Sequence, residues 1–348
     1  MPEWLNVRTA AGAFLTLAVM GMGADPQVWV HVSPYAQDVW HAATASAPPF
    51  PPSRLHWFGT DQDGHDLFAR ILYGALPTLR DATLLVLAIW GLSGAIALLR
   101  TVWHVPLPLF DLAAGLMSLV PPMLVALLLL EAPGIYFSAR LNLWYYLVIA
   151  LLESARFAPT LEGDLRLILG RPFIEAARTT GCAPVRILTR HVWPWWRPYL
   201  AEYLPLTYAR VLAVMGELAY FGIFSHLRLI RTENAVVIDS RQLDWPALIG
   251  AASQHWFSDP APVLFPTLAL CVLILGLRLL AAGLAPEPAR GDASWAPAAW
   301  PQGRDRRRRM AGGLRGGWRR RPGCATLLAD NRGVEARQFE DRGSDSLL

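Results

Sequence analysis

The stretch DATLLVLAIWGLSGAIALL, from Asp81 to Leu99, decides the fold class. After Asp81 it contains no charged residue until Arg100. A helix of ~20 mostly apolar residues is long enough to cross the hydrocarbon core of a bilayer. Backbone polar groups in lipid must be hydrogen-bonded within the segment, which favours a helix over a single strand. The stretch therefore predicts a membrane-spanning helix.

The composition of the whole chain supports this prediction. The chain has 348 residues, of which 54% are hydrophobic and 17% are charged, whereas soluble domains carry about 25% charged residues. Mean hydropathy is positive. We predict an all-α polytopic membrane protein with about six transmembrane helices. The candidate spans are 9–24, 82–99, 108–130, 143–160, 199–222 and 263–285.

Arginines near the span ends predict the orientation, because cytoplasmic loops carry an excess of basic residues. The connection between the fourth and fifth spans contains six arginines from Arg166 to Arg197, and the C-terminal tail is also arginine-rich. Both should be cytoplasmic, as should the N-terminus. Three arginines of the 223–262 loop oppose this topology: Arg228, Arg231 and Arg241.

The predicted organisation has four parts. Residues 1–24 form the N-terminus and the first transmembrane helix, and residues 25–80 form an outward loop. The transmembrane core covers 81–286 and includes the polar loop 171–198. The tail 287–348 lacks apolar periodicity, so we expect it to be disordered and cytoplasmic, with membrane lipid as a partner.

The loop RPFIEAARTTGCAPVRILTRHVWPWWRP, residues 171–198, is polar and basic between two apolar segments. Pro172 is suited to the first turn of a helix, and Gly181 to its end. Phe173, Ala176 and Ala177 share a face at helical spacing. A second helix is expected from Pro184 to Val192, ended by Pro194. The loop thus predicts an elbow of two short helices outside the bilayer.

The same loop resembles the EAA loop of ABC importer permeases. The residues that match in type and spacing are Glu175, Ala176, Ala177, Gly181 and Pro194. In that family the elbow is the coupling helix, which docks on a cytoplasmic ATPase subunit. The resemblance implies this ATPase-coupling role here and a type I-like permease fold.

A second motif narrows the family. HWFGTDQDGHDLFARILYGALPTL, residues 56–79, resembles a signature of the second permease subunit of dipeptide, oligopeptide and nickel importers. Leu76, Pro77 and Thr78 depart from it. A third segment, DWPALIGAASQHWFSDPAPVLFPTLAL at 244–270, resembles the region before the last helix of that family. The outer-face residues that match the signature are His56, Gly59, Thr60, Asp61, Gly64 and Asp66.

The resemblance implies an inner-membrane permease subunit that forms half of a pathway for peptides or similar small solutes. Its implied partners are two ABC ATPase subunits, a second permease subunit and an extracytoplasmic solute-binding protein. The sequence has no Walker A motif, so ATP hydrolysis by that route belongs to the partners. We expect no catalytic residue, no cofactor and no nucleic-acid partner.

Two alternatives remain open. Divergent spans and the unusual tail allow a degenerate permease with a structural role. The cluster of His56, Asp61, Asp63, His65 and Asp66 allows an intramembrane metal enzyme, because His and carboxylates bind first-row metals. The resemblance assigns this cluster to a structural turn, so we predict no metal site.

Ionisable residues within the predicted spans are candidates for function, because charge in a membrane faces a cavity or a partner. Arg210 and Glu217 lie seven residues apart, hence on one helical face. They are predicted to line the solute pathway or to brace a partner helix. Glu153 and Arg156 are predicted to form a local pair in the fourth span.

Overall fold

A computed structural model describes residues 7–38, 47–138, 140–231, 236–240 and 242–285. The predicted disordered tail, 287–348, lies outside the described residues, as do the first six residues. Within the described ranges the regular secondary structure is helical apart from one short hairpin, and the predicted all-α class is confirmed.

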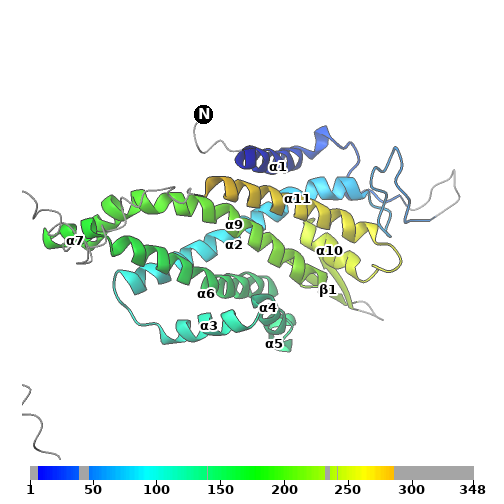
Figure 1. The fold of residues 1–348 in the computed structure, drawn as a ribbon. Coiled ribbons are helices and arrows are strands. Elements are labelled where there is room, and N and C mark those ends of the chain that lie inside the picture. Colours follow the sequence, from blue (N-terminus) through cyan, green and yellow to red (C-terminus); the bar gives the residue numbers. More distant parts are fainter. Residues whose placement is uncertain (1–6, 39–46, 139, 232–235, 241, 286–348) are drawn as a thin grey trace, which may run out of the picture. The chain divides into compact units, whose positions relative to one another are not determined.

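Five long helices make up most of the described chain (Figure 1). Each of them covers one of the predicted apolar segments. Helix α2 packs against α6, α9 packs against α11, and α11 packs against α1. The five are α1 (Val7–Ala24), α2 (Leu67–Thr101), α6 (Leu141–Leu169), α9 (Trp193–Tyr220) and α11 (Ala261–Leu284).

Helix α2 begins well before its apolar stretch. Asp66 is its N-cap, and the Asp66 side chain accepts a hydrogen bond of 2.7 Å from the backbone N–H of Ala69. The last part of segment 25–80, expected as an outward loop, is therefore helical. Arg70 and Arg80 lower the hydropathy of this first half, which hid the helix from a hydropathy-based prediction.

The segment predicted as one span at 108–130 is broken. Helix α3 (Pro108–Leu119) and helix α4 (Pro122–Leu130) meet at an angle of 107°. Pro121 and Pro122 stand at the break, where proline removes a helical hydrogen bond and restricts the preceding residue. A straight helix over 108–130 was therefore a wrong expectation.

The number of membrane spans depends on whether helices that carry charged residues are counted. Among the described helices, α1, α2 and α11 are long and apolar enough to cross a membrane, and the bent α3–α4 pair makes a fourth if it is one span. Helices α6 and α9 have 29 and 28 residues, but both carry several charged side chains. The count of about six therefore stays a prediction.

Small residues let α1 and α11 approach closely. A Cβ atom on Gly12 would lie 2.3 Å from the backbone nitrogen of Leu280, and one on Gly283 would lie 2.7 Å from the nitrogen of Thr9. Such contacts between backbones are typical of helix pairs in membranes. Any side chain at either glycine would push the two helices apart.

The buried core lies between α2, α6, α9, α10 (Trp245–Ser253) and α11. A hairpin of β1 (Leu227–Arg231) and β2 (Val236–Ser240) follows α9, opposite the end that carries α7 (Figure 1). No strand was predicted there. The remaining short elements are η1 (Pro26–Val28), α5 (Pro133–Tyr136), α7 (Pro172–Thr179), α8 (Pro184–Ile187) and the π-helical turn η2 (Leu188–Val192).

Candidate functional site

The outer-face motif folds into a tight turn that is closed by its own side chains. Thr60 and Asp66 form an isolated bridge, and Gly59 and Gly64 adopt φ values of +80° and +83°. His56 Nδ1 lies 2.8 Å from Asp66 Oδ2. Because Asp66 also caps α2, the turn fixes where that helix begins.

Asp61 is the centre of this turn. Its carboxylate accepts hydrogen bonds from the backbone N–H groups of Asp63 and His65, at 3.0 and 2.8 Å. Arg70 Nη1 donates to it at 2.6 Å. Both oxygens are therefore engaged within the chain. These contacts give Asp61 a structural role, which agrees with the interpretation of the motif as a structural turn.

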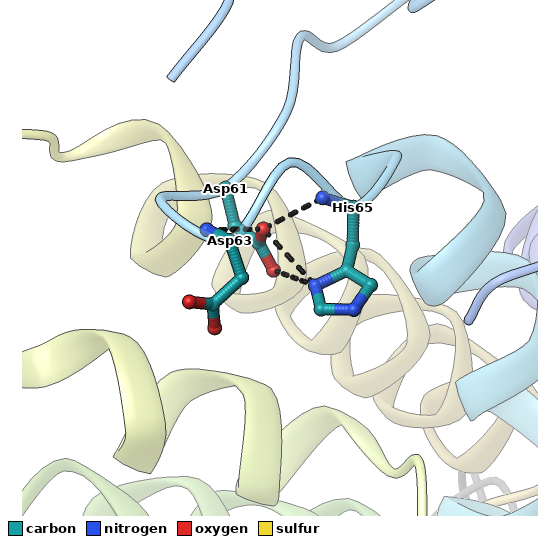
Figure 2. A group of neighbouring side chains, drawn as sticks. All are labelled: Asp61, Asp63 and His65. Carbon is teal, nitrogen blue, oxygen red and sulfur yellow. Dashed lines mark hydrogen bonds and ion pairs between the residues drawn. The ribbon is translucent and has the colours of Figure 1, made fainter. Parts of the chain in front are cut away.

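The cluster of Asp61, Asp63 and His65 is shown in Figure 2. One ligand atom from each residue lies within 4.8 Å of the others. The Asp63 carboxylate points away from the His65 ring, whereas the Asp61 carboxylate points toward it (Figure 2). A metal would have to compete with Arg70 for Asp61, so the donor set is a poor fit to a metal enzyme.

The third motif packs directly on the second, although the two are far apart in sequence. The Trp245 backbone N–H donates to Thr78 Oγ1 at 2.9 Å, and the Trp245 indole N–H donates to the carbonyl of Ile71 at 2.7 Å. A Cβ atom on Gly74 would lie 3.0 Å from the Trp245 ring. A hydroxyl at position 78 thus holds α10 against α2.

The predicted elbow has two different faces. Ile174 is fully buried and Ala177 is buried, and both belong to a buried cluster with residues of α6, α8 and α9. The expected shared face of Phe173, Ala176 and Ala177 is therefore wrong in part. Phe173 instead stacks on Trp195, with 5.9 Å between ring centroids, because the inward face of α7 is set by Ile174.

Gly181 ends the first arm of the elbow. It has φ of +80°, a conformation that costs residues with a Cβ about 1–2 kcal/mol. The Gly181 N–H donates to the carbonyl of Arg178 at 3.0 Å, and the Cys182 N–H donates to that of Ala177 at 3.1 Å. These bonds close the helix and turn the chain toward α8.

Pro194 was expected to end the second arm of the elbow, but it does not. Helix α8, the turn η2 and helix α9 follow one another without a gap from Pro184 to Tyr220. Pro194 lies in the first turn of α9, where its missing N–H is tolerated. The π-helical turn just before it widens the helix, so the elbow continues into the membrane core as one rod.

The exposed face of α7 carries Glu175, Ala176, Arg178 and Thr179. No ion pair to Glu175 occurs among the described residues. The small Ala176 lies beside it, so another surface can approach closely. This geometry suits a contact with a partner more than a contact within the chain.

The two charged residues predicted on one face of α9 have different surroundings. Arg210 Nε lies 2.6 Å from Glu153 Oε2 of α6, and Glu153 is buried. Glu217 is exposed. Glu153 thus pairs with Arg210 across two helices rather than with Arg156 along one. Opposite charges at similar depths of two predicted spans were the sequence signal for this pair.

Two buried acids escaped the sequence analysis. Asp81 of α2 and Asp244, just before α10, are buried, and Asp244 accepts a hydrogen bond of 3.2 Å from Ser225. Asp81 Oδ2 lies 3.6 Å from His226 Nε2. Burial, with the nearby charge of Asp81, raises the pKa of Asp244 to about 7. Each acid lies next to an apolar run in the sequence, and this position was the signal that could have predicted its burial.

Comparison with known proteins agrees with these motifs. No protein-family model matches the chain. It is 30% identical over 247 residues to a probable peptide ABC transporter permease protein of Sinorhizobium fredii, covering 67% of this chain and 74% of that protein. It is 27% identical over 237 residues to a putative peptide transport system permease protein of Brucella suis, covering 67% and 73%.

A third relative comes from a different transport system. The chain is 25% identical over 236 residues to the glutathione transport system permease protein GsiD of Escherichia coli, covering 67% of this chain and 71% of that protein. All three relatives are named as permease components of transport systems. The chain belongs to the family of permease subunits of peptide ABC transporters, multi-pass proteins of the inner membrane that are transport subunits and not enzymes.

Proposed function

We propose that this chain forms half of the membrane pathway of an importer for peptides or similar small solutes. A second permease subunit completes the pathway, two ABC ATPase subunits drive it, and an extracytoplasmic solute-binding protein delivers the solute. The relatives named for peptide and glutathione transport support the solute class. The proposed topology has about six spans with both termini in the cytoplasm.

The elbow is the proposed site of coupling to the ATPase, through Glu175, Ala176, Ala177, Gly181 and Pro194. The observation that carries this proposal is the division of α7 into a buried face with Ile174 and an exposed face with Glu175. A partner that pulls on the exposed face moves Ile174. The buried cluster that Ile174 shares with α6, α8 and α9 then transmits the motion to the pathway.

Arg210 and Glu217 are proposed to face the pathway, and the turn of His56, Gly59, Thr60, Asp61, Gly64 and Asp66 is proposed to shape the outer entrance. A cavity of about 150 Å³ supports the second proposal. It is lined by residues of both the second and the third motif, Asp61, Asp63, Arg70, His255 and Asp259 among them. A docked binding protein would release its solute near this cavity.

The test is purification of the tagged chain from its native membranes in mild detergent, with peptide uptake measured in the same cells. Two ATPase subunits and a second permease should co-purify with the wild type, and the ATPase subunits should be lost from Glu175→Arg. Glu131→Arg is the matched control, because Glu131 is exposed at the end of α4 and lies outside the elbow. Recovery of the wild-type chain alone, without uptake, would favour the degenerate permease.

A further inference from the structure

A second cavity lies between α6 and α9, away from both the outer turn and the elbow. Its volume is about 210 Å³, and it is open on one side. Its polar lining consists of Glu153, Arg156, Thr160, Tyr203, Thr207 and Arg210. These residues lie between Glu153 and Thr160 of α6 and between Tyr203 and Arg210 of α9, so in the proposed topology the cavity extends from the middle of the two spans toward their cytoplasmic ends.

The charges that line this cavity do not cancel. Glu153 contributes one negative charge, and Arg156 and Arg210 contribute two positive charges. The Arg210–Glu153 pair, at 2.6 Å, accounts for one of each sign. Arg156 is exposed, and no ion pair to it occurs in the described parts of the chain. One positive charge is left over within a predicted span, where a charged side chain needs water or a counter-charge.

Glu153 also holds Arg210 in place. Its Oε2 accepts from Arg210, while its Oε1 is buried and has no hydrogen-bond partner among the described residues. A buried acceptor without a donor is unfavourable. An anionic group brought to the arginines would balance the leftover positive charge, while Glu153 keeps Arg210 in position.

Helices α6 and α9 each contain a proline beside the cavity. Pro159 precedes the cavity residue Thr160 in α6, and Pro205 lies between the cavity residues Tyr203 and Thr207 in α9. Each proline removes one backbone hydrogen bond within its helix. Helices bend most readily at such positions, so the width of the cavity can change when α9 moves with the elbow.

We propose that this cavity binds a carboxylate group of the solute in transit, through Arg156 and Arg210, with Glu153 orienting Arg210. The inference rests on the proposed transport function and adds the chemical class that the pathway recognises. Guanidinium groups form paired hydrogen bonds to carboxylates, and a peptide carries one carboxylate at its C-terminus.

The experiment is thiol labelling of the assembled transporter in native membranes. Thr160→Cys is introduced after Cys182, Cys271 and Cys324 have been replaced by serine, and labelling by a small maleimide is timed. Trialanine should slow labelling saturably, by about tenfold at ten times its half-saturating concentration. Trialanine C-terminal amide should protect far less, because it lacks the carboxylate.

Variants of Arg156 test whether this residue binds the carboxylate. Arg156→Gln should abolish the difference between the acid and the amide, and Arg156→Lys should retain part of it. Arg278→Gln is the matched control, because Arg278 is exposed on α11 and does not line the cavity. It should leave the difference intact. Arg156 is exposed, so its variants should fold as the wild type does. An unchanged rate of labelling without peptide checks this.

The contrary outcomes are distinct. Equal protection by acid and amide, protection that survives Arg156→Gln, or a Thr160→Cys side chain that never labels would overturn the inference. Uptake of di- and tripeptides by the same membranes would then leave the proposed function standing. Membranes that take up no peptide, from a complex that contains no ATPase, would overturn the proposed function and the inference together.

Discussion

The outer turn and the elbow are both polar segments next to apolar helices, but they use their polar side chains differently. In the turn, His56, Asp61 and Asp66 are buried and bonded to one another or to α2. In the elbow, Glu175 and Arg178 are exposed, and the buried contacts are made by Ile174 and Ala177. Polar groups satisfied within the chain stabilise the fold, whereas polar groups left on a docked helix are available to a partner.

The two segments also lie at opposite ends of α2. Asp66 caps the first turn of that helix, and the elbow packs near Ala97 in its last turns. Substitutions in the turn should therefore change stability, and substitutions on the exposed face of the elbow should change transport. The following experiments test this division, from the largest expected change in stability to the smallest.

Asp66→Ala should have the largest effect. It removes the cap of α2 and leaves Nδ1 of the buried His56 ring without its partner, while Nε2 keeps its contact with Asp38. These losses should lower the free energy of unfolding by about 3 kcal/mol. Unfolding by SDS in mixed micelles measures it. Asp66→Asn keeps an acceptor for the Ala69 N–H and should lose clearly less. Equal losses would mean that the cap contributes little.

Gly181→Ala should destabilise the elbow by about 1–2 kcal/mol, because alanine is strained at the positive φ of this residue. Faster cleavage of 171–198 by a protease added to inside-out vesicles would report the opening. Gly170→Ala is the control, since Gly170 ends α6 with φ of −81°. If both variants were cleaved alike, backbone strain at Gly181 would not explain the effect.

Asp244 should make stability depend on pH. Its pKa is raised to about 7 in the folded protein from an ordinary value of 3.8, so the folded state binds the proton more tightly than the unfolded state. Its contribution is fully present below the ordinary pKa and is lost as pH rises through 7. Between pH 6 and 8 the loss should be about 1.4 kcal/mol.

The comparison for Asp244 is the Asp244→Asn variant, measured by the same unfolding titration at each pH. The amide keeps an acceptor for Ser225 but does not titrate. The difference in stability between wild type and variant should therefore change across this range. A constant difference would show that Asp244 does not titrate between pH 6 and 8 and would contradict a folded-state pKa of about 7.

Much of the helical layout was predictable from the sequence, because long apolar runs permit few alternatives. The run after Asp81 and the run after Pro260 both became helices of the expected type. The start of α2 at Leu67 was predictable in principle, since Asp66 is a good cap residue, but charges at Arg70 and Arg80 masked it.

Other features depended on contacts that spacing does not encode. Pro194 was expected to stop a helix, but the π-helical turn η2 accommodates it. The Glu153–Arg210 pair joins two helices. The sequence does not show which residues of α6 and α9 face each other, so it could not identify this pair. For the elbow, the motif located Glu175, but only the packing of Ile174 distinguished its buried face from its exposed one.

The most direct test of this account is Glu175→Arg, the substitution with the smallest expected effect on stability. Glu175 is exposed and outside the buried contacts of α7, so its unfolding free energy should stay within about 0.5 kcal/mol of wild type. Peptide uptake should nevertheless fall by more than about tenfold, because a reversed charge at an interface is costly. Uptake equal to that of the wild type, at equal protein levels, would contradict the coupling role of the elbow.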